Sequence, residues 1–274
     1  MKLLNLINLD KSEIKYNLTR FPDGEPQISF PNEFDRKDSV KVICRITSAE
    51  ELFILTQVGD ILDRQEIIWD LFITYLMSMR MDRVMDFNRP FSLKVVCNIL
   101  NTMNYRHVII LEPHSERIKE LLRTRCYSQE FNFKPYIDTQ SNIVFPDAGA
   151  YQRYKVLSNN WGHIVFNKVR DLETGKIKEF SIEKEVNCYY PTFTFIDDLC
   201  DGGGTFCWAA SILRERFGKD VKLNIFIKHL VNPVGLEKLI NSFDNVYITD
   251  SYKDWEPKVI SLNAQKKVHI IHLT

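Results

Sequence analysis

The segment FIDDLCDGGGTFCWAASILRERFG, residues 195–218, carries two adjacent carboxylates and a run of glycines in front of an amphipathic helical pattern. An apolar run leads into Asp197 and Asp198, and the glycines at 202–204 lead into Thr205. The first backbone N–H groups of a helix are unpaired and carry the positive end of the helix dipole, so a helix N-terminus binds anions. Glycines let the backbone close around a phosphate. The segment therefore predicts a strand, a phosphate-binding loop and a helix N-terminus.

The two carboxylates restrict what this loop can hold. It lacks both the Gly-Lys-Ser/Thr of a Walker A loop and the glycine spacing of a Rossmann loop. Carboxylates beside a phosphate repel it unless they bind hydroxyl groups or a divalent metal ion. Ribose hydroxyls and Mg²⁺ would satisfy Asp197 and Asp198 together.

Short apolar runs alternate with amphipathic patterns along the chain. This β-α-β order is typical of parallel sheets covered by helices, so we expect an α/β fold. Strands are expected at residues 39–46, 67–76, 107–114, 141–149, 162–169, 192–204, 222–229, 245–250 and 267–273, and helices at 50–65, 90–103, 205–218 and 235–243.

The periodic pattern is lost near residues 128–138, which indicates a domain boundary. We expect an N-terminal domain over residues 1–134 and a C-terminal domain over 135–274, each with a mostly parallel sheet flanked by helices. The last strand either stays in the second domain or returns to the first.

Composition excludes some classes of partner. Lys plus Arg and Asp plus Glu are both 36, so the formal net charge is zero and nothing draws the chain to nucleic acid or to a membrane surface. The six cysteines show neither a CxxC pair nor a zinc-ligand spacing, which favours reduced thiols. The chain contains neither a secretory signal pattern nor an apolar run of membrane-spanning length. We expect a soluble, cytoplasmic protein.

Several polar residues follow predicted strands directly. His114, Asp147 and Lys168 each come after an apolar run, as do the paired aspartates. In open parallel sheets, ligands bind outside the carboxyl ends of the strands. Their shared placement predicts a common site, although each residue also has an ordinary structural explanation. A strand-end histidine is often a structural hydrogen-bonding residue, and Lys168 with Arg170 would by charge alone belong to a solvated hairpin.

The motifs resemble those of one enzyme family. FIDDLCDGGGT is similar to the ribose-phosphate loop of ribose-phosphate pyrophosphokinases, which type I phosphoribosyltransferases share. RFPDGE (20–25), SMRMDR (78–83), RPFSLKVVCNIL (89–100) and LEPHSERI (111–118) resemble pyrophosphokinase segments in the same order and at about the same spacing. A phosphoribosyltransferase would have no need of the first two of these, so the resemblance favours the pyrophosphokinases.

The resemblance implies two phosphoribosyltransferase-like domains and transfer of the β,γ-diphosphoryl group of ATP to the anomeric hydroxyl of ribose 5-phosphate. It also implies Mg²⁺ as cofactor, and a homo-oligomer, because the adenine-contacting residues usually act across a subunit interface. Motif by motif, it assigns ATP contacts to Phe21, Asp23, Glu25, Arg80, Asp82 and His114, metal contacts to His114 and Asp147, catalysis to Lys168, Arg170 and His114, and ribose-phosphate contacts to Asp197, Asp198, Asp201, Gly202, Gly203, Gly204 and Thr205.

Departures from the family pattern leave the acceptor open. Gly202 stands where the family has Thr, Met81 where it has Gln, and Ala150 where it has a second Gly; KHLVNPVG (228–235) differs from the usual T-H-x-x-F-S-G. A loop without the threonine side chain suits a phosphate that carries a further substituent. The family extends to phage-encoded relatives that diphosphorylate ADP-ribose for NAD resynthesis. ADP-ribose is therefore an alternative acceptor, and host cytoplasm the location for a phage-encoded chain.

A second alternative comes from another functional class. A non-catalytic regulatory paralogue would have the same fold without the chemistry. Such a chain is expected to lose the lysine and arginine of the catalytic loop. Lys168 and Arg170 are both present, which favours an enzyme.

Overall fold

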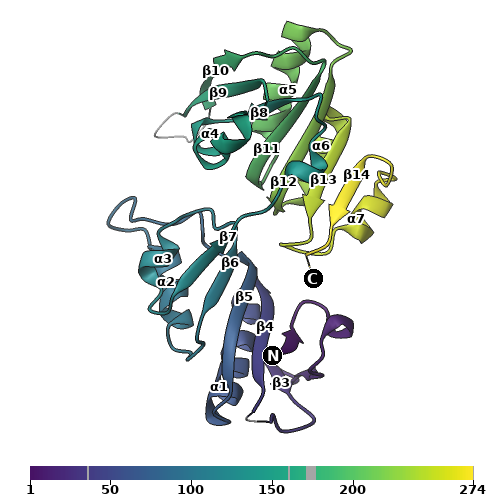
Figure 1. Ribbon diagram of the computed structural model, residues 1–274. Coiled ribbons are helices and arrows are strands. Elements are labelled where there is room, and N and C mark those ends of the chain that lie inside the picture. The colour runs from purple at the N-terminus through teal and green to yellow at the C-terminus, as the bar shows by residue number, and fades with distance from the viewer. Residues whose placement is uncertain (36, 160, 171–176, 274) are drawn as a thin grey trace. The chain divides into compact units, whose positions relative to one another are not determined.

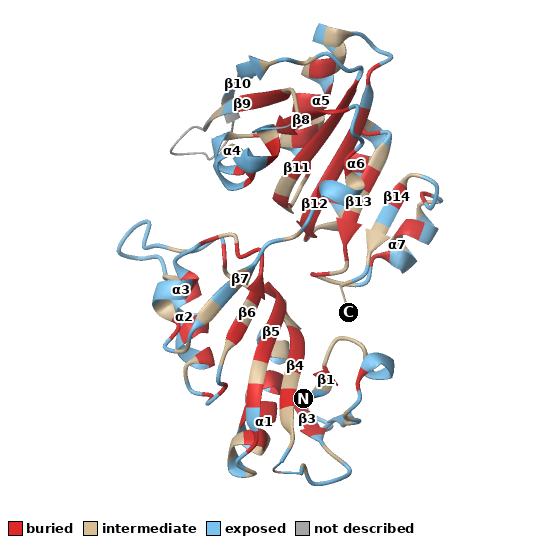
Figure 2. Ribbon diagram, in the orientation of Figure 1, coloured by how far each residue is buried: buried red, intermediate tan, exposed pale blue. Residues whose placement is uncertain are grey.

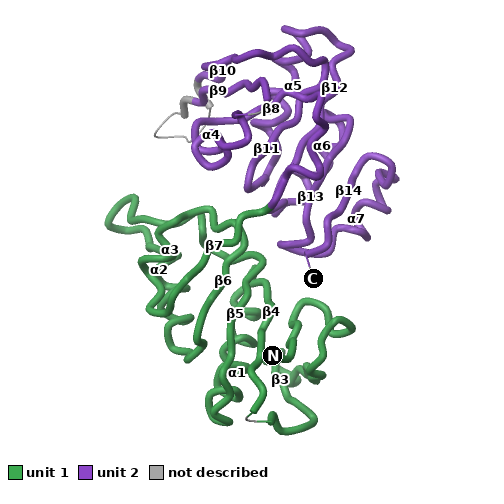
Figure 3. The backbone as a smooth tube through the Cα atoms, in the orientation of Figure 1, with its two compact units in different colours: residues 1–131, 274 green, residues 132–273 purple. Residues whose placement is uncertain are grey.

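The computed structural model describes residues 1–35, 37–159, 161–170 and 177–273, and leaves the side chains of residues 169, 170, 177 and 178 undescribed (Figure 1). The chain divides into two compact units, Met1–Phe131 and Asn132–Leu273 (Figure 3). This division falls inside the segment 128–138 where the sequence loses its periodicity. Each unit has its own mostly parallel sheet flanked by helices, so the expected α/β organisation is confirmed.

Unit 1 is built on a parallel sheet. Its strand order is β1 (Lys2–Asn5), β4 (Ser39–Ile46), β5 (Ile68–Leu76), β6 (Val108–Leu111) and β7 (Cys126–Gln129). The sequence predicted the three central strands; β1 and β7 were not predicted. Its helical elements are η1 (Leu9–Lys11), α1 (Ala49–Arg64), α2 (Ser92–Leu100) and α3 (Ile118–Leu121).

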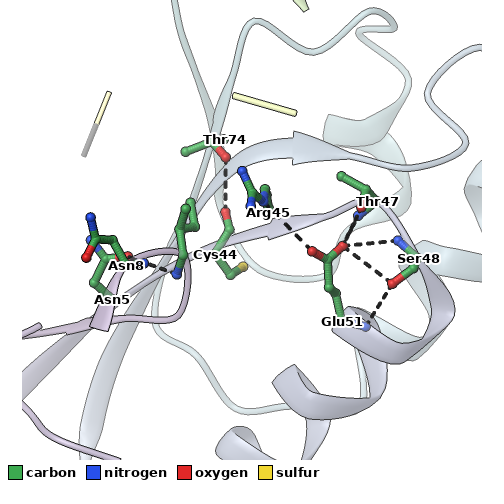
Figure 4. A network of polar contacts seen from close by, with 9 residues as sticks. Asn5, Asn8, Cys44, Arg45, Thr47, Ser48, Glu51 and Thr74 are labelled. Carbon is green, nitrogen blue, oxygen red and sulfur yellow. Dashed lines mark hydrogen bonds and ion pairs between the residues drawn. The ribbon is translucent and has the colours of Figure 1, made fainter. Parts of the chain in front are cut away.

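Helix α1 begins at a capping box just beyond the carboxyl end of β4 (Figure 4). The backbone N–H of Glu51 donates to Ser48 Oγ at 3.2 Å, and the N–H of Ser48 donates back to Glu51 Oε2 at 3.2 Å. Thr47 adds donors from its backbone and its hydroxyl to the same carboxylate oxygen, each at 2.6 Å. These bonds satisfy the unpaired donors of the first helical turn, which fixes where the strand ends and the helix starts.

A two-stranded antiparallel hairpin, β2 (Asn17–Arg20) and β3 (Pro26–Ser29), packs on α1. The Gln57 side chain of α1 accepts from the Ile28 N–H at 3.0 Å and donates to the Pro26 carbonyl at 2.9 Å. Because this amide bonds a donor and an acceptor of β3, it acts as an extra strand partner and fixes the hairpin on the helix.

Unit 2 contains a larger sheet. Its strand order is β10 (Ile177–Val186), β9 (His163–Arg170), β8 (Asn142–Phe145), β11 (Thr192–Cys200), β12 (Lys222–Leu230), β13 (Asn245–Thr249) and β14 (Val268–Ile271). Only the β9–β10 pair, among the described strands of this sheet, is antiparallel. The helical elements are η2 (Lys134–Tyr136), α4 (Ala148–Tyr154), η3 (Lys155–Asn159), α5 (Gly204–Phe217), α6 (Pro233–Ser242) and α7 (Glu256–Ser261).

The last strand of the chain lies in this second sheet. Val268 pairs with Val246 and Ile271 with Thr249, in parallel register. Of the two arrangements that the sequence left open, β14 therefore stays beside β13 and does not return to the first sheet.

The core of unit 2 covers both faces of β11 and β12, which are buried along most of their length (Figure 2). On one face Phe193 and Phe195 pack against the aromatic rings of Phe217 and Phe243, at 4.8 and 5.0 Å between centroids. On the other, Phe226 packs against Phe133 at 4.7 Å. Burial on both faces explains the continuous apolar runs that identified these strands. Within the described residues, no helix has the length and apolarity needed to span a membrane.

Candidate active site

Three carboxylates gather at the carboxyl ends of β8 and β11, which are parallel neighbours. Asp197 and Asp198 lie in the last part of β11, and Asp147 is the N-cap of α4, where its side chain accepts from the Ala150 N–H at 3.0 Å. Burial, together with the charges of Asp198 and Asp147, raises the pKa of Asp197 well above its usual value. Closely spaced, partly buried carboxylates with a raised pKa are common at functional sites.

The two adjacent aspartates differ in their surroundings. The Asp198 carboxylate is buried and lies 3.4 Å from the Arg153 guanidinium of α4. Asp197 accepts a hydrogen bond from the backbone N–H of Asp198 at 2.8 Å. The two side chains also contact each other, which contributes to the raised pKa of Asp197.

The glycine loop closes against the start of α6. Gly203 is the N-cap of α5 with φ of +73°, a conformation that favours glycine. A Cβ atom on Gly203 would lie 3.2 Å from the Gly235 carbonyl oxygen, and one on Gly235 only 1.9 Å from the Asp201 carbonyl oxygen. Asn232, the N-cap of α6, donates to the Asp201 carboxylate at 3.0 Å. These close approaches fix the loop, while Gly202 and Gly204 face open space.

Lys168 reaches this loop from β9. Its ammonium donates to Thr205 Oγ1 at 2.9 Å, across 37 residues of sequence. Thr205 is the second residue of α5. The strand continues through Lys168, which is paired with Phe180 of β10, so the residue lies inside an antiparallel pair and not in a solvated connection after the strand. Lys168 therefore lies within the strand that the sequence predicts over 162–169.

The β9–β10 pair is also packed onto α5. The Phe166 and Phe180 rings stack at 4.9 Å, and Phe180 stacks on Trp208 at 5.3 Å. This aromatic column lies next to the Lys168–Thr205 contact and holds β9 against the start of α5. Arg170 ends β9, and its side chain lies outside the described part of the structure.

In unit 1, the SMRMDR and LEPHSERI segments follow β5 and β6 and are bonded together. The Ser115 hydroxyl donates to Asp82 Oδ2 at 2.8 Å, and the Arg117 guanidinium donates to the Asp82 carbonyl at 3.2 Å. Ser78 and Glu112, at the ends of the two strands, have φ of +67° and +43°. Non-glycine residues in this conformation are strained and cluster at functional sites. The structure thus joins the segments that carry Arg80 and His114.

The hairpin tip carries Phe21, Asp23 and Glu25, all of them exposed. The Asp23 side chain accepts from the Glu25 N–H at 3.1 Å and shapes the turn. Phe21 is 49% exposed, which is high for an aromatic ring. A cavity of about 420 Å³ lies between the hairpin and α1, lined in part by Phe21, Glu25 and Arg64.

The structure adds residues that the motifs did not reveal. Arg153, Asn232 and Ser115 each contact a predicted site residue. Asn232 lies in KHLVNPVG (228–235) and Arg153 three residues after Ala150, in segments that were compared with the family pattern, but their contacts with the carboxylates depend on strand pairing and helix packing. Ser115 lies inside LEPHSERI and could have been included with His114. Within the described residues, no group of three or more His, Cys, Asp or Glu side chains is arranged to hold a metal ion.

Comparison with known proteins supports the resemblance. The chain is 23% identical over 273 residues to a ribose-phosphate pyrophosphokinase of Mycoplasmopsis pulmonis, covering 94% of this chain and 81% of that one. It is 25% identical to the Helicobacter hepaticus protein of the same name, covering 89% of this chain and 81% of that one. A Bacillus caldolyticus ribose-phosphate pyrophosphokinase is 28% identical, over 76% of this chain and 68% of that protein. No protein-family model matches the chain.

A solved structure has the same fold. The phosphoribosylpyrophosphate synthetase of Mycobacterium smegmatis superposes with a TM-score of 0.75, at 16% identity, over 100% of this chain and 95% of the other. The expected arrangement of two domains, each with a mostly parallel sheet, is therefore confirmed at the level of the fold. The resemblance rests on similarity along nearly the whole chain and not on one motif.

Proposed function

We propose that this relative of the ribose-phosphate pyrophosphokinases is itself a diphosphotransferase, which converts ATP and ribose 5-phosphate into phosphoribosyl pyrophosphate and AMP. The observation that carries the proposal is the contact of Lys168 with Thr205, 2.9 Å across the rim of the glycine loop. This contact brings a mobile positive charge to the N-terminus of α5, beside two carboxylates. A helix N-terminus binds the phosphate of a sugar, and the lysine is then close enough to bind a second, transferred phosphate group.

The acceptor binds through the loop and the aspartates. The phosphate of ribose 5-phosphate accepts hydrogen bonds from the backbone N–H groups at the start of α5 and from Thr205. The carboxylates of Asp197 and Asp198 accept hydrogen bonds from ribose hydroxyls. Asn232 and Gly235 support this arrangement, because Asn232 bonds the Asp201 carboxylate and Gly235 packs closely against the loop backbone.

Transfer depends on charge placed around the moving group. The anomeric oxygen attacks the β-phosphorus of ATP, the bond between the β-phosphorus and the oxygen of the α-phosphate breaks, and AMP leaves; the hydroxyl proton passes to solvent. Charge develops on the phosphoryl oxygens in the transition state, where positive side chains are most effective. Lys168 supplies such a charge, and Arg170 and His114 are assigned supporting roles by the matching motifs.

Mg²⁺ fits this site only together with substrate. Magnesium is usually held by one or two carboxylates plus substrate phosphates and water, and the described residues form no cage of three protein ligands. Asp147 and His114 are the proposed protein contacts. When bound, the ion neutralises phosphate oxygens of ATP.

Adenine recognition is assigned to the exposed hairpin tip. Phe21 offers a ring for stacking, and Asp23 and Glu25 offer acceptors for the exocyclic amine. Because the tip is exposed, we propose that a second copy of the chain supplies the rest of the adenine site and that the active protein is at least a dimer. Light scattering at assay concentration tests this: full activity of a monomer contradicts it.

The acceptor preference is tested at Gly202. A Cβ atom there meets nothing within 4 Å, so the backbone leaves room for the first atom of a side chain. If the missing side chain makes room for ADP-ribose, Gly202→Thr shifts kcat/KM toward ribose 5-phosphate. A hydroxyl bonded to a charged phosphate contributes about 1.5–3 kcal/mol, equivalent to about 10- to 150-fold. A wild-type protein that is inactive with ADP-ribose removes this alternative.

The enzyme is proposed to act in the cytoplasm, where its nucleotide substrate is present. Its activity is tested by incubating the chain with ATP, Mg²⁺ and ribose 5-phosphate and identifying the products by mass spectrometry. Lys168→Met serves as the matched inactive control, because it removes the charge and keeps most of the side-chain volume. Products formed equally by both proteins would point to a contaminating enzyme and would count against the proposal.

A further inference from the structure

Lys228 is fully buried in the sheet of unit 2. Its relative exposure is 0%, and it lies near the carboxyl end of the apolar strand β12. Burying an ammonium group costs several kcal/mol unless an opposite charge lies close to it, and lysine is almost never fully buried in proteins. A fully buried lysine therefore indicates a negatively charged group close by and a role that outweighs the cost of burial.

Strand register places Asp198 directly opposite Lys228. In the parallel pair β11–β12, Asp197 is opposite Ile227 and Leu199 is opposite His229. Asp198 is therefore opposite Lys228. Opposite residues on neighbouring strands point to the same face of the sheet and lie about 5 Å apart at Cβ. Both residues are buried, at 4% for Asp198 and 0% for Lys228.

The face that they share is the one covered by α4. Arg153 of α4 approaches Asp198 to 3.4 Å from above this face. Phe226, two residues before Lys228 on the same side of β12, packs on Phe133 at 4.7 Å. Asp198 thus has Arg153 close to its carboxylate and Lys228 opposite it on the neighbouring strand, while Asp197 has Asp198 and Asp147 as charged neighbours.

The backbone at Lys228 is held rigidly. Its carbonyl accepts from the hydroxyls of Thr249 at 2.6 Å and Ser251 at 3.0 Å, and the Ser251 hydroxyl lies 2.9 Å from His229 Nδ1. The side chains of Thr249 and Ser251 are short and that of His229 is planar, and they lie at the carboxyl end of β12. This network fixes the direction in which the lysine side chain leaves β12.

We propose that Lys228 is a positioning residue of the acceptor site, which acts through Asp198. Its ammonium, with Arg153, neutralises Asp198 and fixes the direction of its carboxylate, so that the carboxylate meets the ribose hydroxyls of the acceptor. This inference rests on the proposed function and assigns a role to the first residue of KHLVNPVG (228–235), a segment that departs from the family pattern.

The test compares Lys228→Met with the wild type in steady-state assays. Methionine keeps the length and apolar stem and removes the charge. We expect KM for ribose 5-phosphate to rise about tenfold or more, with KM for ATP changed less than about twofold. The matched control is Asn224→Leu, a buried polar residue of the same strand and the same face at its other end. The control is expected to lower stability without changing KM for the acceptor.

Equal effects of the two variants on KM, or a larger effect on ATP than on the acceptor, would overturn the proposal. A merely structural lysine would lower the unfolding temperature and leave the ratio of the two KM values unchanged. The pairing itself is tested by a double-mutant cycle with Asp198→Asn, read out by unfolding. We expect the double variant to be more stable than Lys228→Met alone, because no uncompensated carboxylate remains buried; additive losses would refute the pairing.

Two measurements distinguish a failure of this proposal from a failure of the proposed function and from misfolding of the variant. If the wild type makes no phosphoribosyl pyrophosphate, the proposed function fails, and the unfolding cycle still decides whether Lys228 and Asp198 are paired. If Lys228→Met does not fold, a crystal structure of the wild type with ribose 5-phosphate decides. We expect Lys228 Nζ within about 3.2 Å of the Asp198 carboxylate and that carboxylate on a ribose hydroxyl; a carboxylate turned away from the sugar would overturn the role.

Discussion

The ammonium of Lys168 lies 2.9 Å from the hydroxyl of Thr205, although one residue belongs to an edge-side antiparallel strand and the other to the first turn of α5. The contact spans 37 residues and joins the one antiparallel strand pair among the described strands of unit 2 to the glycine loop before α5. We infer that the hydroxyl holds the lysine near the place that a transferred phosphate will occupy. When substrate binds, its phosphate replaces Thr205 as the hydrogen-bond partner of the lysine.

This relationship predicts the effect of removing the charge. Lys168→Ala is expected to lower kcat about 100-fold or more, equivalent to about 2.7 kcal/mol, because the charge is most useful in the transition state. The unfolding temperature is expected to stay close to that of the wild type. Lys184→Ala, on the neighbouring strand β10 and bonded to Tyr151, is the control with nearly normal kcat. Near-normal turnover in Lys168→Ala would reject the role.

The glycines of the loop are predicted to differ in their tolerance of a side chain. Gly203 has φ of +73° and little room beside Gly235, so Gly203→Ala should cost at least about 1–2 kcal/mol of stability. Gly204 lies in the helix with nothing within 4 Å of its Cβ position, so Gly204→Ala should be neutral or stabilising by up to about 1 kcal/mol. Urea unfolding of both variants measures the difference; equal effects would contradict the loop geometry.

The carboxylate cluster predicts a pH-dependent stability. Because the pKa of Asp197 is raised, the folded protein keeps a proton that the unfolded chain releases, and the cluster loses stability as pH rises above the usual carboxyl pKa. Asp197→Asn removes this proton equilibrium. We therefore expect the variant to be more stable than the wild type at neutral pH, with the advantage shrinking toward acid.

Thermal unfolding between about pH 4 and about pH 8 measures this trend. The exposed Asp220→Asn, in the turn before β12, is the control and should show the same pH dependence as the wild type. An advantage of Asp197→Asn that is constant over the whole range would show that the raised pKa is not its cause. Activity of Asp197→Asn should fall, because a ribose-binding carboxylate is lost.

The hydrogen bonds that fix the β2–β3 hairpin on α1 predict an effect on nucleotide binding alone. Gln57 bonds both Ile28 and Pro26, so Gln57→Ala should loosen the hairpin tip and raise KM for ATP several-fold, with KM for ribose 5-phosphate unchanged. Gln65→Ala, which removes a single bond to the Phe34 N–H at the other end of α1, is the control. Parallel changes in both KM values would mean that the hairpin has no separate role in binding ATP.

The sequence predicted the fold wherever burial imposes a pattern. The buried strands β5 and β11 appear as apolar runs, and α1 as a periodic helix with a Ser-x-x-Glu capping box. The short strands β1 and β7 were missed, because edge strands of four residues carry too few apolar positions to form a pattern.

The site was only partly predictable for a different reason. Asp197, Asp198 and the glycines stand together in sequence, so their local chemistry shows directly. Arg153 comes close to Asp198 through helix packing, and Lys228 is placed opposite it by strand register, neither of which a single sequence displays. Lys168 was identified by its motif and lies within the strand expected over 162–169, but its antiparallel partner β10 was not predicted, because that strand is largely polar.

The central claim is that two phosphoryl groups move together from ATP to the acceptor, and isotope transfer tests it most directly. The chain is incubated with Mg²⁺, ribose 5-phosphate and ATP that carries ³²P at the β-phosphorus, and the products are separated. The proposed mechanism predicts unlabelled AMP and a sugar product that carries the label. Two results would contradict it. One is labelled ADP together with a sugar product that has gained a single, unlabelled phosphoryl group. The other is label that stays in ATP both with ribose 5-phosphate and with ADP-ribose as the acceptor.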